Sequence, residues 1–96
     1  GTTVRSCLML AAQADGAQVQ TIEGLTSSGE IADLQAAFVE RNALQCGFCT
    51  PGMLFAATDL LATSRPLTRE AVREQLSGNY CRCTGYQAIV DAILET

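Results

Sequence analysis

Two pairs of cysteines are the residues in this sequence whose type and spacing could do chemistry. Cys46 and Cys49 form a C-x2-C pair, and Cys81 and Cys83 form a C-x-C pair farther along the chain. Thiolates bind soft metal ions and iron–sulfur clusters, and cysteines this close in sequence commonly bind one metal centre. The two pairs therefore predict four sulfur ligands that meet at one point, and we interpret that point as an iron–sulfur cluster.

The residues that follow each pair predict that the sulfurs lie at the start of a helix. Thr50 and Pro51 follow Cys49, an order typical of an N-cap and the first helical turn. Thr84 follows Cys83 in the same way. A helix N-terminus offers free backbone N–H groups and partial positive charge, which stabilise an anionic cluster and tune its reduction potential. This arrangement suits an electron carrier.

Two other interpretations of the same cysteines remain open on spacing alone. Structural zinc also favours four thiolates, although its usual pattern is two C-x2-C knuckles that lie closer together. Disulfides would need an oxidising compartment and would leave one of the five cysteines unpaired. A reducing compartment fits the cysteine usage best, so we expect a cytoplasmic protein.

Composition argues against several other classes of function. The six basic residues are scattered arginines and the net charge is −4, so nucleic acid is not an expected partner. The apolar runs are far too short to span a bilayer, so no membrane span is expected. With no histidine and no convincing nucleophile–base pair, the chain is expected to have no independent active site.

The first part of the chain carries strand and turn patterns. Val4–Met9 and the alternating stretch Gln18–Ile22 predict two strands, with a turn at Asp15-Gly16 between them. Two strands alone are marginally stable in water. This part of the chain is therefore expected to need partners.

From Thr26 onward the pattern predicts helices. Ser27 and Glu30 have the spacing of a capping box, and the helix that they begin is expected to end near Arg41. A second helix follows Thr50.

The second helix is expected to stop at Ser64-Arg65-Pro66, a third to begin at the cap Thr68, and a fourth to follow Gly85. The apolar faces of the four helices are predicted to form the core. They consist of Ile31, Leu34, Ala37 and Phe38; Met53, Leu54, Ala57, Leu60 and Leu61; Ala71, Val72 and Leu76; and Tyr86, Ile89, Val90, Ile93 and Leu94.

The order of these elements predicts a mainly α fold. In each half, a helix leads into a cysteine loop, then a threonine, then another helix. We therefore expect residues 26–96 to form a four-helix bundle of two helix pairs that meet at the cysteines and are related by a pseudo-two-fold axis. A short β segment in residues 1–25 would precede it.

Two segments around the cysteine pairs, Gln45–Met53 and Gly78–Tyr86, carry a family resemblance. They closely resemble the helical [2Fe–2S] domain of the molybdenum hydroxylases, which include xanthine dehydrogenases, aldehyde oxidases, bacterial carbon monoxide dehydrogenases and N-heterocycle hydroxylases. Val4–Leu8 and Thr21–Leu25 resemble the stretch that precedes that domain. The resemblance covers essentially the whole chain and favours the iron–sulfur interpretation over zinc.

The resemblance implies a role for each matching residue. Cys46, Cys49, Cys81 and Cys83 match the four ligands of the helical-domain [2Fe–2S] cluster. Gln45 matches a glutamine that hydrogen-bonds the pterin of a molybdopterin cofactor, and Cys83 matches the ligand nearest that pterin. Without the family, we would interpret Gln45 as a surface or helix-end amide.

Cys7 matches the last ligand of a second [2Fe–2S] cluster, which belongs to a plant-type ferredoxin-like domain. The other three ligands should lie upstream of Gly1, so Cys7 alone cannot assemble that cluster. We therefore expect residues 1–25 to be the C-terminal remnant of a ferredoxin-like domain and the chain to be a fragment of a longer subunit. The alternative for Cys7 in isolation is a small buried hydrophobe.

The resemblance as a whole implies an electron-transfer iron–sulfur subunit of a molybdenum hydroxylase. Electrons would pass from molybdopterin (as its cytosine dinucleotide) in a large subunit, through this cluster and the second cluster, toward FAD in a medium subunit. The end of the chain at Thr96, soon after the fourth predicted helix, favours a separate small subunit. The rival hypothesis is a structural zinc module for protein–protein contact.

Overall fold

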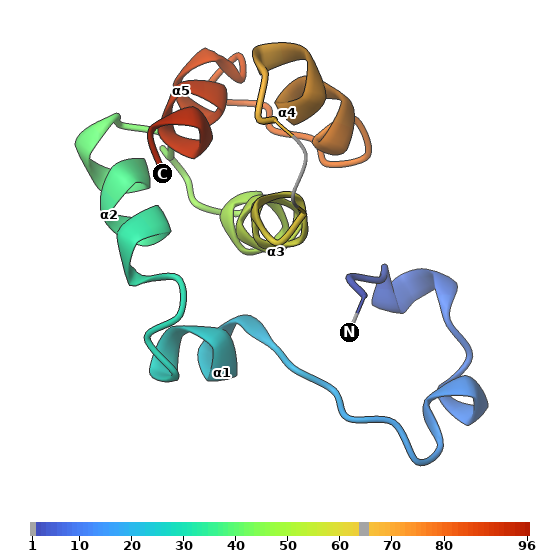
Figure 1. Ribbon diagram of the computed structural model, residues 1–96. Coiled ribbons are helices and arrows are strands. Elements are labelled where there is room, and N and C mark those ends of the chain that lie inside the picture. Colours follow the sequence, from blue (N-terminus) through green and yellow to red (C-terminus); the bar gives the residue numbers. More distant parts are fainter. Residues whose placement is uncertain (1, 64–65) are drawn as a thin grey trace.

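The computed structural model describes residues 2–63 and 66–96, and its regular structure is helical (Figure 1). The mainly α class is therefore confirmed. As far as they are described, the helices include none with the length and apolar character needed to traverse a bilayer. The elements are two short 3-10 helices, η1 (Ser6–Leu8) and η2 (Ala11–Ala14), and the α-helices α1 (Ile22–Ser27), α2 (Ala32–Glu40), α3 (Thr50–Leu61), α4 (Arg69–Gln75) and α5 (Gln87–Glu95).

Helix α5 is the centre of the packing. It packs against α2 on one side and against α4 on the other, and α4 also packs against α3 (Figure 1). Its residues Ile89, Val90 and Ile93 are fully buried, as their helical spacing predicts. Burying one such side chain stabilises the fold by about 1.5–3 kcal/mol. The stripe on α5 therefore holds the other helices in place.

The other predicted apolar faces also enter the core. Four of the predicted core residues are only partly buried. They are Leu61 on α3, Ala71 on α4, Tyr86 just before α5 and Leu94 on α5. The remainder of the predicted core is buried, and it is joined by Leu25 and Ala43. The buried members are Ile31, Leu34, Ala37, Phe38, Met53, Leu54, Ala57, Leu60, Val72, Leu76, Ile89, Val90 and Ile93.

The predicted starts of two helices agree with the structure to within one residue. The Thr68 hydroxyl accepts a hydrogen bond from the Ala71 backbone N–H at 3.1 Å and caps α4. Helix α3 begins at Thr50 with Pro51 in its first turn, and Cys49 takes the N-cap position. Helix α3 ends at Leu61, and the predicted stop at Ser64-Arg65-Pro66 begins outside the described residues.

The predicted capping box at Ser27 and Glu30 is wrong. Ser27 is the last residue of α1, and Gly29 then adopts a left-handed conformation (φ +78°) that interrupts the helical path. Ser28 shapes this turn, because its hydroxyl donates to the Leu25 carbonyl at 2.9 Å and accepts from the Glu30 N–H at 3.4 Å. Helix α2 consequently begins only at Ala32.

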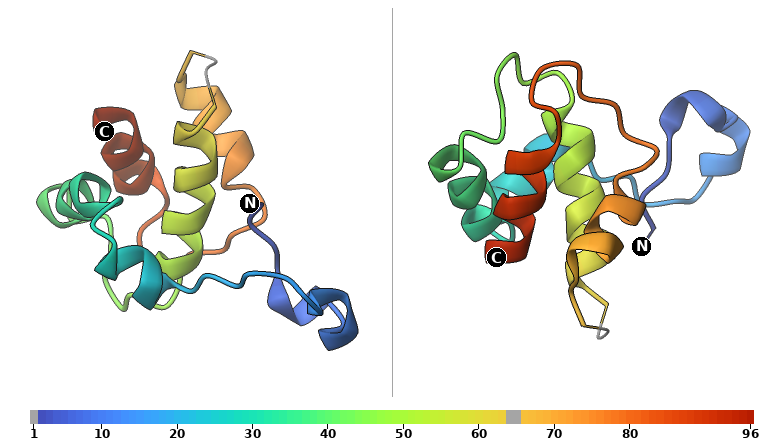
Figure 2. Two further views of the ribbon diagram at one scale, coloured as in Figure 1. Left: turned by 60° about the horizontal axis from the view of Figure 1, so that its bottom comes forward. Right: turned by 90° about the horizontal axis from the view of Figure 1, so that it is seen from above.

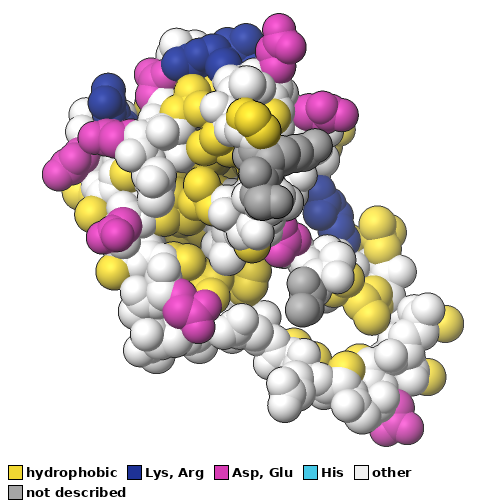
Figure 3. All heavy atoms as spheres, viewed as in Figure 1, with side chains coloured by type: hydrophobic (Ala, Val, Ile, Leu, Met, Phe, Trp, Pro, Cys, Tyr) yellow, Lys and Arg dark blue, Asp and Glu magenta, His cyan; other side chains and the backbone are white. Residues whose placement is uncertain are grey.

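The two strands predicted at Val4–Met9 and Gln18–Ile22 do not form in the described residues. The first stretch contains η1, the second is irregular, and Ile22 already belongs to α1. The physical reason is that two strands alone are marginally stable in water, and the described residues supply no third strand for them to pair with. Leu8, Leu10 and Val19 are instead largely exposed on this N-terminal segment, which extends from the helical body (Figure 3).

The N-terminal segment is held to the helices by a few polar contacts. The Thr3 N–H donates to Asp59 Oδ2 on α3 at 3.1 Å, and the Arg5 guanidinium donates to Asn79 Oδ1 at 3.0 Å. The segment thus contacts the loop that leads into the second cysteine pair.

Phe38 and Val39 offer a direct test of this core. Phe38 is 2% exposed and Val39, its neighbour on α2, is 69% exposed. We expect Phe38→Ala to lower the free energy of unfolding by about 3–5 kcal/mol, because it removes a buried ring and leaves a cavity. Val39→Ala should change it by about 0.5 kcal/mol or less. Chemical denaturation followed by circular dichroism would measure both, and equal losses in the two variants would contradict the assigned core.

Candidate metal centre

The two cysteine loops lie beside each other at one end of the helical body (Figure 2). The first loop connects α2 to α3 and carries Cys46 and Cys49, and the second connects α4 to α5 and carries Cys81 and Cys83. The packing of α5 between α2 and α4 brings the loops together. The four cysteines predicted from sequence therefore converge, although the two pairs are far apart along the chain.

The sulfurs meet as pairs that cross between the loops. Cys46 Sγ and Cys83 Sγ are 3.5 Å apart. The Cys49 and Cys81 thiols form the other pair, close enough that each shifts the pKa of the other. All five cysteines carry free thiols, so the disulfide alternative is not realised.

This pairing fits a two-iron cluster better than a single ion. In a [2Fe–2S] cluster four cysteines are shared between two irons, whereas structural zinc takes four ligands around one ion. Within residues 2–63 and 66–96, no three cysteine, histidine or acidic side chains are grouped closely enough to hold one metal ion.

The start of α3 contains a polar group that also fits an anionic cluster. The Thr50 hydroxyl, next to Cys49, is buried and has no hydrogen-bond partner in the described part of the chain. A buried hydroxyl without a partner is costly, and an acceptor such as a cluster sulfur would satisfy it. The donor set and this unpaired hydroxyl are both compatible with a [2Fe–2S] group held by the two loops.

The environment shifts the pKa values of two thiols in opposite directions. Burial, together with the neighbouring Cys81, raises the pKa of Cys49 to about 11. Burial opposes ionisation of Cys81 as well, but hydrogen bonds from the Thr84 hydroxyl and N–H bring its pKa down to about 7. Positive charge beside Cys49, such as that of iron, would favour its thiolate form.

Gln45, on the first loop, connects the two loops through its side chain. Its side-chain Nε2 donates a hydrogen bond to the Cys83 backbone carbonyl at 3.2 Å, and the residue is exposed. The amide thus ties the first loop to the second at the exposed side of the centre, where Cys46 and Cys83 are also exposed.

Cys7 does not join the other four cysteines. It is exposed in η1, on the N-terminal segment, which touches the second cysteine loop through Arg5 and Asn79 without bringing Cys7 to the other thiols. The alternative that Cys7 is a small buried residue in this chain is therefore wrong, because nothing in the described residues packs over η1.

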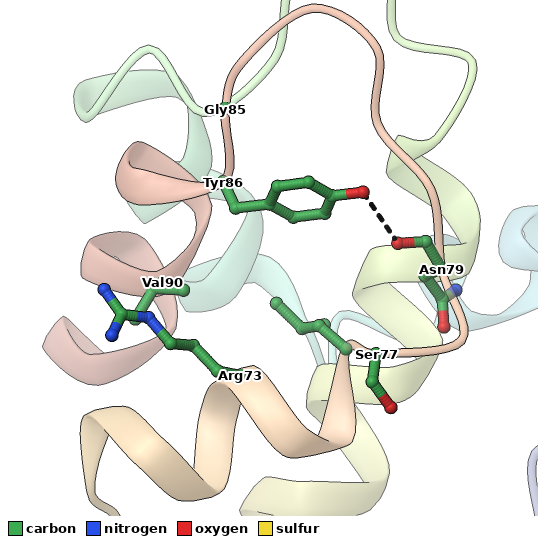
Figure 4. Close-up of a pocket in the computed structure, with 7 residues that line it drawn as sticks. Arg73, Ser77, Asn79, Gly85, Tyr86 and Val90 are labelled. Atoms are coloured by element: carbon green, nitrogen blue, oxygen red, sulfur yellow. Dashed lines mark hydrogen bonds between the residues drawn. The ribbon is translucent and has the colours of Figure 1, made fainter.

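Tyr86 is a residue whose role the sequence analysis missed. Its hydroxyl accepts the Cys81 backbone N–H at 2.9 Å and donates to the Asn79 carbonyl at 3.4 Å, so the ring reaches back to the start of the ligand loop (Figure 4). The residue has a left-handed conformation, with φ +74°, directly after Gly85 at φ +68°. For a bulky residue this conformation costs about 1–3 kcal/mol and persists only when the surroundings impose it.

The two tyrosines near the second pair differ in their environment. The side chain of Tyr86 is partly buried against the core and lines a shallow pocket of about 350 Å³ together with Leu76 and Val90. Tyr80 is 86% exposed. A cue for Tyr86 was available in the sequence: a tyrosine that follows a glycine, between a ligand loop and a helix.

Comparison with known proteins places this chain in a family. The sequence pattern described as the [2Fe-2S] binding domain matches residues 21–94. The nicotine 6-hydroxylase small subunit of Paenarthrobacter nicotinovorans is 57% identical over 99% of this chain and 57% of its own length. The xanthine dehydrogenase iron-sulfur-binding subunit of Escherichia coli O157:H7 is 48% identical over 99% of this chain and 61% of its own length.

A solved structure agrees with these sequence relatives. The match is a chain of quinoline 2-oxidoreductase from Pseudomonas putida 86, with a TM-score of 0.85 and 52% identity over 94% of this chain and 56% of that chain. The chain thus spans somewhat more than half the length of these relatives, which are named as parts of larger oxidoreductases. The resemblance seen in the cysteine segments is confirmed. Converging thiols, a helical body and these matches together show that the chain belongs to the [2Fe–2S] binding domain family.

Proposed function

We propose that this chain is the helical part of an electron-transfer iron–sulfur subunit of a molybdenum hydroxylase. The observation that carries the proposal is the pairing of thiols across the two loops, with Cys46 and Cys83 Sγ at 3.5 Å. Cys46, Cys49, Cys81 and Cys83 would hold the cluster. When bound, the cluster would supply one-electron transfer between a molybdopterin centre and further carriers.

The chain's own residues support such a carrier by holding the ligands rigidly. The Cys81 backbone is fixed by the Tyr86 hydroxyl, and the two loops are tied together by Gln45. A rigid donor set changes little between redox states, which favours rapid electron transfer. No residue of this chain is proposed to act on the substrate of the complete enzyme.

The exposed side of the centre is the proposed contact with a large, molybdopterin-binding subunit. Cys83 and Gln45 lie on this side and are both exposed. We propose that Gln45 contacts the pterin and that Cys83 is the ligand on the pterin side of the cluster. The molybdopterin is proposed to be the cytosine dinucleotide, as the family resemblance implies.

The N-terminal segment is proposed to lead to the next carrier. Residues 1–25 would be the C-terminal remnant of a ferredoxin-like domain, and Cys7 would be one ligand of its [2Fe–2S] cluster. Electrons would continue from there to FAD in a medium subunit. Support comes from the exposed apolar residues Leu8, Leu10 and Val19, which this chain leaves uncovered.

Two further features complete the proposal. The two helix pairs that end in the cysteine loops are proposed to be related by a pseudo-two-fold axis, since each loop joins two helices that pack in the core. The complete protein is proposed to work in the cytoplasm, where thiol ligands stay reduced.

Spectroscopy of the full-length subunit tests the metal assignment. We expect the oxidised protein to be red-brown, and dithionite to bleach it and produce [2Fe–2S] EPR signals. Cys83→Ser should abolish or alter one EPR signal, and Cys7→Ser should affect a different one, because the two residues would serve separate clusters. A colourless, EPR-silent protein with one tightly bound zinc would establish the structural zinc alternative instead.

Gln45→Ala tests the proposed contact with the pterin. The variant should keep its cluster, since Gln45 is not a ligand, but lose hydrogen bonds on the exposed side of the centre. We expect reduction of the cluster by substrate, through the molybdenum subunit, to slow by roughly two- to tenfold, the range of one net hydrogen bond. Stopped-flow absorption would measure this rate. Reduction by dithionite is the control, and an unchanged substrate-driven rate would contradict the role given to Gln45.

Tyr86→Phe tests whether the tyrosine hydroxyl supports the ligand loop. The variant keeps the ring but loses both hydrogen bonds to the loop, the one from Cys81 and the one to Asn79. Each such bond contributes about 1 kcal/mol, so losing both should make iron release to a chelator roughly thirtyfold faster. Tyr80→Phe is the matched control, because Tyr80 is 86% exposed. Equal release rates in the two variants would show that the Tyr86 hydroxyl does not stabilise the centre.

A further inference from the structure

We propose that the Thr84 hydroxyl raises the reduction potential of the centre by donating a hydrogen bond to the Cys81 sulfur. This inference rests on the proposed function, in which Cys81 is a cluster ligand. Thr84 would then adjust the reduction potential of the cluster without being one of its ligands.

The contact between Thr84 and Cys81 is made twice. Thr84 Oγ1 lies 3.1 Å from Cys81 Sγ, and the Thr84 backbone N–H points to the same sulfur with an N···S distance of 3.4 Å. Distances of this size are short for contacts to sulfur, whose radius exceeds that of oxygen. The sulfur of Cys81 therefore has two polar contacts with one residue, of which the backbone N–H is a donor.

The direction of the hydroxyl hydrogen bond follows from its surroundings. Thr84 Oγ1 already accepts a hydrogen bond from the Tyr86 backbone N–H at 3.1 Å. This leaves the hydroxyl proton free to point elsewhere. A metal-bound thiolate has no proton and can only accept, so with the cluster bound the hydroxyl must be the donor.

The sign of the effect on the potential follows from charge. Reduction adds one electron to the cluster and so increases the negative charge shared by its sulfurs. A hydrogen bond to a ligand sulfur stabilises the reduced form more than the oxidised form, and the potential is raised. Removing the Thr84 hydroxyl should therefore lower the potential.

The test is a redox titration of the full-length subunit in its assembled complex, followed by EPR. The signal to follow is the one that Cys83→Ser alters. At the potential where the unaltered cluster is half reduced, Thr84→Val should raise the ratio of oxidised to reduced cluster by about two- to tenfold, the range of one net hydrogen bond. Thr84→Ala should shift the ratio in the same direction, and Thr84→Ser, which keeps the hydroxyl, should restore it.

Controls separate tuning from a general loss of structure. Thr63→Val makes the same substitution beyond the C-terminal end of α3, the end away from the cysteine loop, and should leave the potential unchanged. Unchanged potentials in Thr84→Val and Thr84→Ala, with the signal still present, would overturn the inference and leave the proposed function intact. Equal shifts in the Val and Ser variants would also overturn it, because the hydroxyl would then be irrelevant. If Cys83→Ser altered no EPR signal, the proposed function would fail and this inference with it.

Discussion

The site depends on the close approach of two loops that are distant in sequence. The sulfurs of Cys46 and Cys83 lie 3.5 Å apart because α5 packs between α2 and α4, which brings together the loop before α3 and the loop before α5. The fully buried residues of α5 therefore serve the site as well as the fold. Cluster binding would in turn join the same two loops, so the core and the metal centre stabilise each other.

Several residues of the two cysteine loops adopt left-handed conformations. Asn42, Gly47, Gly85 and Tyr86 all have positive φ, and of these Tyr86 has the bulkiest side chain, for which this conformation is most costly. Its hydroxyl, bonded to Cys81 and Asn79, offsets that cost and orients the loop. Asn79 also accepts from Arg5 on the N-terminal segment, so that segment is connected by hydrogen bonds to the loop that holds Cys81. Each of these contacts restrains the loop that carries Cys81, although none of them involves a further cysteine.

The sequence by itself determined the features that depend on local pattern. Helical spacing identified the buried faces of α2–α5, because burying an apolar stripe is the main source of helix stability in a small domain. The capping chemistry of Thr68 and the position of Pro51 located two helix starts. The two cysteine pairs were recognisable as one candidate set of ligands because cysteines this close in sequence commonly bind one metal centre. The family also followed from these residues.

Only the tertiary structure decided the features that need contacts between distant residues. The composition of Val4–Met9 predicts a strand. A strand needs other strands to pair with, and the described residues supply no such partner strand. Gly29, in a left-handed conformation, separates α1 from α2. The local capping pattern had instead predicted that a helix begins at this place. The approach of Cys46 to Cys83 follows from how the two loops fold over each other. The reach of Tyr86 to Cys81 and the double contact of Thr84 with one sulfur follow from the folded shape of the second loop itself. Such contacts depend on three-dimensional packing, and residue spacing along the chain does not specify them.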